Sequence, residues 1–244
     1  QSIRTLVVVD DPDGGPRTRQ LTLSAMMLYA SIGDRADAIG VYAPGDPPVE
    51  LPAAPLGQAE TFQTVRSELQ GMSKAKPAPF GRVARVAQAA FGEPRPGVRD
   101  AVVILAHGPR SGSHDPKIPP KLGQAFAKRG ISVFVVAFGS KANADAYRSL
   151  VEPTRGKAFT VTKGEQLEQA FSDIFTRLHD TEGLPVVGDR LVMDDSIGSA
   201  TVVLPKKNRK DRNALVTPGD RVLRAKTKYP GVKWKSFAEY DLVR

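Results

Sequence analysis

The sequence predicts an α/β fold for residues 1–182, a doubly wound and mostly parallel sheet with helices on both faces. A partial β-sandwich is expected to follow over residues 183–244. Short β-branched runs alternate with segments of helical period up to about residue 180. These strand-like runs are continuously apolar, which is typical of a sheet that is covered on both faces. After Gly183 only short strand-like runs with turns between them follow.

The elements of the first part follow one another in a regular order. The expected strands are SIRTLVVVD (2–10), DAIGVYAP (37–44), AVVILAHG (101–108), ISVFVVAFG (131–139) and KAFTVT (157–162). The expected helices cover residues 17–32, 60–69, 80–91, 119–130, 142–152 and 164–180. Residues 44–57 are rich in Pro, Gly and Ala, and we expect a loop there. Ligands of such sheets bind at the carboxyl ends of strands, which here are the loops after Val9, Leu105 and Phe138.

The last part reads as a β-rich domain. Its strand-like runs are DRLVMDD, SATVVLP, NALVTP, RVLRAK and WKSFAEYDLVR. About 60 residues are few for a sandwich, which usually needs nearer 100, so we expect this domain to be incomplete. No apolar run of the chain reaches the roughly 18–20 residues that cross a bilayer, and no transmembrane segment is expected.

Charge is distributed very unevenly. The chain carries a formal net charge of +9. Between Pro205 and Lys235 stand seven lysines and four arginines against Asp211 and Asp220, so 11 − 2 = +9, and this stretch accounts for the whole net charge. The chain has no cysteine, which excludes disulfides, thiol catalysis and thiolate metal sites.

The order of elements carries a family resemblance. A strand ending in Asp10 precedes an amphipathic helix, and VVILAHG and ISVFVVAFGSKANADAYRSLVEPTRGKAFTVTKGEQLEQAFSDIF come later. Residues 3–180 resemble a von Willebrand factor type A (VWA) domain. The following β-rich part, with MDDSIGSATVVL, is similar to calcium-activated chloride channel regulators and to large bacterial secreted VWA proteins.

The resemblance implies a metal-ion-dependent adhesion site, which this sequence matches poorly. The family supplies Asp-x-Ser-x-Ser, a Thr from a second loop and an Asp from a third. Here Asp10 matches the first Asp, Pro12 and Gly14 replace the serines, and Ala78 or Pro79 replaces the Thr. His107 stands in place of the third-loop Asp. Since Mg²⁺ takes oxygen ligands, we expect a degenerate site without metal or other cofactor, with Asp10 and His107 as its residual candidates.

The acidic first loop allows other interpretations. Asp10, Asp11 and Asp13 resemble part of a calcium loop, but Thr22 stands where an EF-hand needs its final Glu. A solvated turn whose acids favour the next helix N-terminus is the alternative. A phosphate loop is disfavoured because no Gly-Lys-Ser/Thr sequence follows.

The stretch HGPRSGSHD (107–115) contains the residue types of a hydrolytic triad or a metal site. His107, His114 and Asp115 are the candidates, with Arg110 and Ser111 as possible ligand contacts. No Gly-x-Ser-x-Gly elbow is present, and an exposed loop is the simpler interpretation. His179, at a helix end, is expected to make a favourable dipole contact.

The basic stretch allows two interpretations. Lys206, Lys207, Arg209 and Lys210 are candidates for contacts with a polyanion, either a glycan or a nucleic acid. The alternative is a solvated hairpin with its aromatic residues in a sandwich core. In favour of that alternative, Trp234, Tyr240 and Leu242 all have even residue numbers in the run VKWKSFAEYDLV, so they would lie on one face if the run is a strand.

The sequence therefore predicts a non-catalytic module for protein–protein interaction, adhesion or assembly, in an extracellular or cell-envelope protein. Its candidate surface is formed by three loops, at residues 10–16, 74–80 and 107–116. Another protein is the expected partner, with weak polyanion binding and hydrolysis as the alternatives.

Overall fold

The chain divides into two units in the computed structural model, unit 1 (Gln1–Thr181) and unit 2 (Glu182–Arg244). The structure describes residues 2–10, 25–26, 28–29, 32–33, 36–46, 48–56, 59–71, 74–76, 78–107, 118–139, 144–162, 164–180, 186–187, 190–191, 200–206, 210, 212–236 and 240–244. No helix among these residues is long and apolar enough to cross a membrane.

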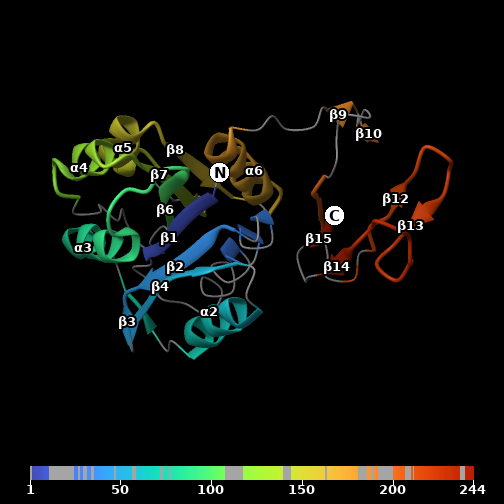
Figure 1. The fold of residues 1–244 in the computed structure, drawn as a ribbon, viewed down its shortest axis with the longest axis horizontal. Helices are drawn as coiled ribbons and strands as arrows, with labels where there is room; N and C mark the ends of the chain where they lie inside the picture. Colours follow the sequence, from blue (N-terminus) through green and yellow to red (C-terminus); the bar gives the residue numbers. More distant parts are fainter. Residues whose placement is uncertain are drawn as a thin grey trace. The chain divides into compact units, whose positions relative to one another are not determined.

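Unit 1 is an α/β structure, as the sequence predicts (Figure 1). Its strands are β1 (Ser2–Asp10), β2 (Ala38–Ala43), β3 (Gly45–Asp46), β4 (Val49–Pro55), β5 (Lys74–Ala75), β6 (Val98–His107), β7 (Ile131–Phe138) and β8 (Lys157–Val161). Its helices are α2 (Ala59–Gly71), α3 (Phe80–Phe91), α4 (Leu122–Lys128), α5 (Arg148–Val151) and α6 (Gly164–His179), with 3₁₀ turns η1 (Ala144–Tyr147) and η2 (Glu152–Thr154).

Six strands form one mixed sheet in the order β4-β2-β1-β6-β7-β8. All neighbours are parallel except β2 and β4. The pairing places Asp10 opposite Ala106 and His107 opposite Phe138, so the carboxyl ends of β1, β6 and β7 lie side by side. This edge of the sheet is where a ligand site is expected.

Helices cover both faces of the sheet, which explains its continuously apolar strands. On one face, alternate residues of β1, β6 and β7 pack against α3, α4 and α5; they include Leu6, Val8, Val102, Ile104, Val133 and Val135. The remaining alternate residues are equally buried, and α6 packs against β7 on their side with Phe171 and Ile174. The predicted doubly wound fold is confirmed.

The prediction of a loop over residues 44–57 is wrong. Half of this segment is β4, which pairs antiparallel with β2 and forms one edge of the sheet. Proline lacks an N–H group, so it disfavours central strands but is tolerated in an edge strand, as at Pro52 and Pro55. The proline content therefore marked an edge strand and not the absence of a strand.

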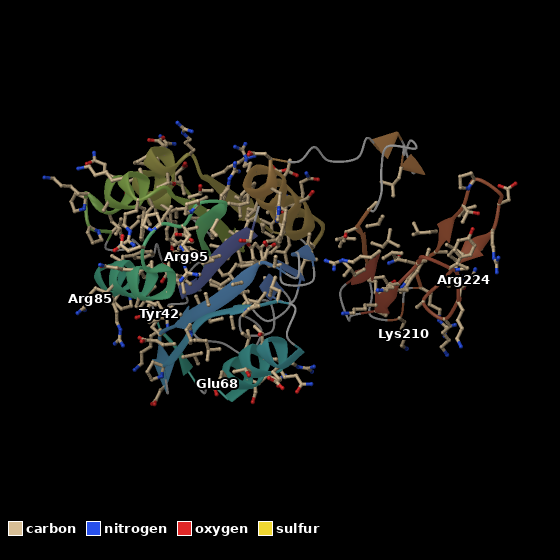
Figure 2. All side chains as sticks on the ribbon, in the orientation of Figure 1. Tyr42, Glu68, Arg85, Arg95, Lys210 and Arg224 are labelled. Carbon is tan, nitrogen blue, oxygen red and sulfur yellow. The ribbon has the colours of Figure 1, made fainter. Side chains whose placement is uncertain are left out.

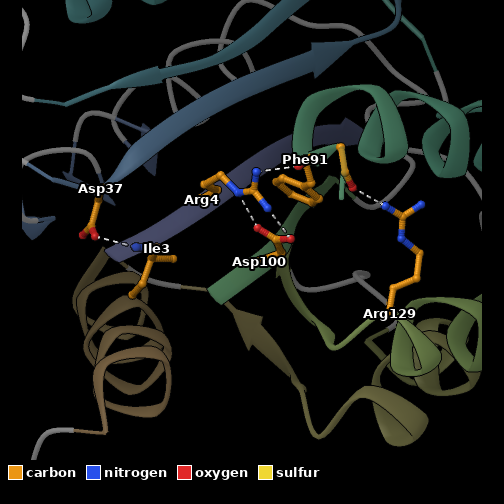
Figure 3. A network of polar contacts seen from close by, with 7 residues as sticks. Ile3, Arg4, Asp37, Phe91, Asp100 and Arg129 are labelled. Carbon is orange, nitrogen blue, oxygen red and sulfur yellow. Dashed lines mark hydrogen bonds and ion pairs between the residues drawn. The ribbon is translucent and has the colours of Figure 1, made fainter. Parts of the chain in front are cut away.

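A network of ionic and polar contacts holds the amino ends of the central strands (Figure 3). Arg4 Nε and Nη2 donate to the two carboxylate oxygens of Asp100 at 2.7 and 2.8 Å, and Arg4 also donates to the Phe91 carbonyl at the end of α3. Arg129 donates to the neighbouring Gly92 carbonyl at 2.6 Å. These contacts satisfy carbonyl groups that the end of α3 leaves without intrahelical partners.

Unit 2 consists of short antiparallel strands. They are β9 (Val186–Val187), β10 (Arg190–Leu191), β11 (Val202–Pro205), β12 (Leu215–Val216), β13 (Val222–Leu223), β14 (Trp234–Ser236) and β15 (Tyr240–Val243). They form the pairs β9–β10 and β12–β13 and a three-stranded sheet, β11-β15-β14. A sandwich formed by these sheets stays a prediction.

The run WKSFAEYDLVR was predicted as one strand, and this is wrong. β14 and β15 pair with each other antiparallel, with Trp234 opposite Val243 and Ser236 opposite Asp241. The parity argument that placed Trp234 and Tyr240 on one face therefore does not hold, because it assumed a single uninterrupted strand.

Candidate functional site

Asp10 and His107 end two neighbouring strands at the carboxyl edge of the sheet in unit 1. Asp10 is the last residue of β1 and is 0% exposed, and His107 is the last residue of β6 and is 6% exposed. Two residues that the sequence selected as metal-site remnants therefore do lie on adjacent strands, but in the interior of the unit.

The protein itself donates hydrogen bonds to both carboxylate oxygens of Asp10. The Ala78 N–H donates to Oδ1 at 2.7 Å, and the Tyr147 hydroxyl donates to Oδ2 at 2.5 Å. Burial raises the pKa of Tyr147 far above its usual value, and the charge of Asp10 raises it further, so the phenol keeps its proton. Charge-assisted hydrogen bonds of this kind are the strong ones in proteins.

Ala78 is one of two residues, with Pro79, that the sequence predicts in place of the family's Thr. Its methyl side chain is buried, and its backbone N–H supplies the contact to Asp10. It directly precedes Pro79 and the start of α3 at Phe80, so the beginning of this helix is tied to the end of β1. The structure brings Ala78 next to Asp10, and the part that bonds Asp10 is its main chain.

Tyr147 is the site residue that sequence reasoning missed. It closes the 3₁₀ turn η1 and is buried, with its ring edge-on to Phe80 at a centroid distance of 6.0 Å. The only sequence signal is the tyrosine in ANADAYRSL, whose polar end needs a hydrogen-bond partner if the ring is buried. That signal indicates a partner but cannot name one 137 residues away.

His107 is a neutral side chain packed against an aromatic ring. It stacks on Phe138 with 4.6 Å between ring centroids and 15° between the planes. Burial lowers the pKa of His107 from 6.5 to about 3, although the charge of Asp10 opposes the shift. An imidazole with so low a pKa is a poor general base near neutral pH.

Several other predicted residues lie outside the described part of the chain. They are Asp11, Asp13, Arg110, Ser111, His114, Asp115, Lys207 and Arg209. Among the residues that the structure does describe, no three His, Asp or Glu side chains form a group that could hold a metal ion.

The comparison with family models now decides the family. The von Willebrand factor type A domain matches residues 19–173, more than half of the chain. The chain belongs to the VWA domain family. VWA domains generally mediate protein interaction or adhesion, are typically not enzymes, and often occur in extracellular or envelope-associated proteins. No curated protein matches the sequence.

Solved structures share the fold of this VWA chain at low sequence identity. A von Willebrand factor type A protein from Catenulispora acidiphila has 12% identity and a TM-score of 0.56, covering 100% of this chain and 54% of its own. The conserved hypothetical protein BatB from Bacteroides thetaiotaomicron has 15% identity and a TM-score of 0.54, covering 73% of this chain and 100% of its own. An aerotolerance-related membrane protein from Bacteroides fragilis has 13% identity and a TM-score of 0.54, covering 74% of this chain and 100% of its own.

The predicted polyanion residues of the VWA chain's unit 2 differ in exposure. Lys206 is buried and paired, because its Nζ lies 2.8 Å from Asp241 Oδ1 and donates to the Ser236 hydroxyl at 2.7 Å. Lys210 is exposed, as is Arg224 (Figure 2). Contacts with Lys206, Ser236 and Asn213 hold the pKa of Asp241 below its usual value, although burial opposes the shift.

His179 makes contacts that its prediction did not include. Its Nε2 lies 3.3 Å from Asp37 Oδ2, and its ring stacks on Phe175 at 5.6 Å. Asp37 also accepts a hydrogen bond from the Ile3 N–H at 2.8 Å (Figure 3). The end of α6 is thereby connected to the beginning of the sheet, in addition to any dipole contact.

Proposed function

We propose that unit 1 is a non-catalytic protein-interaction module for adhesion or assembly. Its binding surface would be the carboxyl edge of the sheet with the loops 10–16, 74–80 and 107–116, called the ligand-loop end, and it would bind without the metal ion of the family. The environment of Asp10 carries this proposal. Its two oxygens accept hydrogen bonds from Ala78 and Tyr147. The positive ends of these N–H and O–H groups point at the atoms that a cation would approach, so they take the place of a metal.

The residues at the site do not fit the Mg²⁺ that the family implies. Mg²⁺ needs near-octahedral oxygen coordination. Of the family's five side-chain ligands only Asp10 is kept, while Ala78 offers a methyl group and His107 a buried imidazole. A neutral imidazole suits Zn²⁺ or Cu²⁺ better, and one such ligand is too few for a stable site.

The same geometry argues against the hydrolase alternative. A general base must reach its substrate and have a pKa near the working pH. His107 is 6% exposed, stacked on Phe138, and has a pKa of about 3. These properties support a packing role for His107.

Photo-crosslinking tests the proposed interaction surface. We expect a photoreactive residue at Lys76 or Pro79, which are exposed near the ligand-loop end, to capture a protein from an extracellular or envelope fraction. Because no metal is needed, capture is expected to be equal in EDTA and in Mg²⁺. The matched control places the same group at the exposed Arg66 on α2. Capture that EDTA abolishes, or that is equal at Arg66, would contradict the proposal.

Calorimetric titration tests the metal directly. With MgCl₂ and MnCl₂ at millimolar concentrations we expect no saturable binding that depends on Asp10. Saturable Mg²⁺ or Mn²⁺ binding that disappears in both Asp10→Asn and Asp10→Ala would overturn the metal-free interpretation. Circular dichroism of the two variants serves as the folding control.

A second candidate function is polyanion binding by unit 2. Nine lysines and arginines are exposed in its described part against one exposed acid, Asp220; they are Lys210, Arg212, Arg221, Arg224, Lys226, Lys228, Lys233, Lys235 and Arg244. Arg221 lies over the Tyr229 ring at 5.0 Å. Lys206 is not part of this surface, because it is paired with Asp241.

Heparin binding at several salt concentrations tests this candidate. Each phosphate or sulfate contact that releases a counterion makes affinity depend more steeply on salt. On duplex DNA, the slope of the logarithm of affinity against the logarithm of salt concentration steepens by about 0.9 per contact. We expect the quadruple change Lys226→Gln, Lys228→Gln, Lys233→Gln and Lys235→Gln to weaken binding and to flatten this slope. The exposed Arg66→Gln is the control in unit 1. Absence of binding at low salt would rule the candidate out.

A further inference from the structure

A hollow opens in unit 1 at the amino edge of the sheet, away from Asp10 and His107. Its volume is about 690 Å³, within the range of small-molecule sites. It begins at Arg99, and the eight-residue rise along β6 to His107 separates it from the ligand-loop end by about 26 Å. The hollow is therefore distinct from the surface of the proposed function.

The hollow exists because β8 is shorter than β7. β7 begins at Ile131, but β8 first pairs with it at Phe134, so the first three residues of β7 have no partner in β8. The Val133 N–H instead donates to Thr154 Oγ1 at 3.1 Å. The missing length of β8 leaves a space between η2, the end of α4 and the end of α6.

Three arginines and one acid line this space. Arg99 is paired with Asp180 and also donates to the Leu178 carbonyl at 2.9 Å. Its guanidinium group is therefore already bound to residues at the end of α6. Arg155 and Arg177 are exposed, and within the described residues neither side chain has an acidic partner. The lining thus has a surplus of two positive charges, from three arginines and one aspartate.

Part of the lining is apolar. Ile131, Phe134 and Leu178 border the hollow but are buried, whereas Pro153 is exposed and Ala127 is half-buried. An apolar lining with a few convergent polar groups at one side is the usual composition of a small-molecule site.

The backbone at the rim is also unusual. Arg155 has φ 58° and ψ 19°, and Asp180 has φ 51°. They are two of the three non-glycine residues with positive φ in the described part of the chain. Glycine adopts this conformation with the least strain, and strained residues that carry charged side chains often mark functional positions.

We propose that this hollow binds a small organic phosphate ester. Guanidinium groups match the geometry of phosphate oxygens with paired N–H donors, so Arg155 and Arg177 would hold the phosphate. The apolar body of the ester would lie against Pro153 and Ala127, the apolar lining residues that are exposed or half-buried. Arg99, already paired with Asp180, orients the end of α6 at the rim.

Calorimetric titration of the full chain with phenyl phosphate at low ionic strength tests this site. We expect one-to-one binding that is about tenfold weaker in each of Arg155→Gly and Arg177→Gln, since each loses a charge-assisted hydrogen bond. Glycine also suits the backbone at position 155, so this variant is expected to fold. Inorganic phosphate is expected to bind more weakly than phenyl phosphate, because it has no apolar body to lie against Pro153 and Ala127.

Two control variants separate the site from general attraction to a basic protein. Arg66→Gln removes an exposed charge from α2, and Lys228→Gln removes one from unit 2. We expect both to bind phenyl phosphate as the unmodified chain does. The proposal is overturned if phenyl phosphate does not bind, if the double variant Arg155→Gly and Arg177→Gln binds it unchanged, if either control loses as much affinity, or if inorganic phosphate binds equally well.

Discussion

Asp10 joins three elements of unit 1 through its buried carboxylate. It lies at the end of β1 and accepts hydrogen bonds from Ala78 and Tyr147. A buried carboxylate without such donors would be strongly unfavourable. The two hydrogen bonds therefore tie β1, the start of α3 and η1 together at one point.

The buried imidazole of His107 makes stability depend on pH. Its pKa is about 3 in the folded chain against 6.5 for an ordinary histidine, so between these values the unfolded chain binds the proton and the folded chain does not. Folding stability then falls as the pH is lowered. Between about pH 7 and about pH 5 the loss from this residue is about 2 kcal/mol.

The pH-dependent contribution of His107 to the free energy of unfolding can be measured by urea unfolding at a series of pH values. The unmodified chain is compared with His107→Gln. Glutamine does not titrate, so the difference in unfolding free energy between the two chains isolates the histidine from the carboxylates that also protonate in acid. A difference that stays constant from neutral to acidic pH would show that His107 is not held neutral by burial.

At the scale of elements, two close approaches fix how unit 1 packs. A Cβ atom at Gly156 would lie 1.6 Å from the Val133 carbonyl oxygen, and one at Gly123 would lie 2.2 Å from the Ser149 carbonyl oxygen. The chain can enter β8 beside β7, and α4 can lie against α5, only because these positions have no side chain. Neither requirement can be recognised from a single sequence, since it depends on which backbone passes nearby.

Gly156→Ala is therefore expected to destabilise unit 1. Forcing a methyl group into a backbone contact costs about 1–3 kcal/mol or more, since the main chain of β7 has little room to move. Gly81→Ala is the matched control, because a Cβ atom there meets nothing within 4 Å, and alanine favours a helix by up to about 1 kcal/mol over glycine. Thermal or urea unfolding measures both, and equal stability of the two variants would contradict the predicted clash.

At the scale of the whole molecule, the two units differ in their cores. Unit 1 buries several layers of side chains on both faces of its sheet. In the described part of unit 2 the buried apolar residues are Leu223, Leu242 and Val243. Because small cores give little stability, we expect unit 2 to unfold under milder conditions than unit 1, as separate domains would.

Two probes can follow the units separately in one urea titration. Trp234 is the only tryptophan of the chain and lies in unit 2, so its fluorescence reports on unit 2. The far-UV circular dichroism of helices reports on unit 1, where the described helices lie. We expect the fluorescence transition at lower urea, and residues 1–181 alone are expected to keep the later transition. Coincident transitions in the full chain would show that the units unfold together.

The sequence by itself determined the class of fold. Apolar runs alternating with helical periods predicted β1, β2, β6, β7, β8 and the helices that cover them, because hydrophobic period is a local property of the chain. The resemblance to the VWA pattern, and not the periodicity, selected Asp10, Ala78 and His107 as candidates for one site. The prediction from sequence failed at residues 44–57, where Pro-rich sequence forms the edge strand β4 through its pairing with β2.

Only the tertiary structure decided what these residues contact. Tyr147 bonds Asp10 across 137 residues, and Lys206 turns from a predicted surface charge into the buried partner of Asp241. The arginine-lined hollow likewise arises where β8 ends before β7 does, from residues that are far apart in the sequence. The physical reason is that burial, charge pairing and the pKa of a side chain depend on neighbours that only the folded chain brings together.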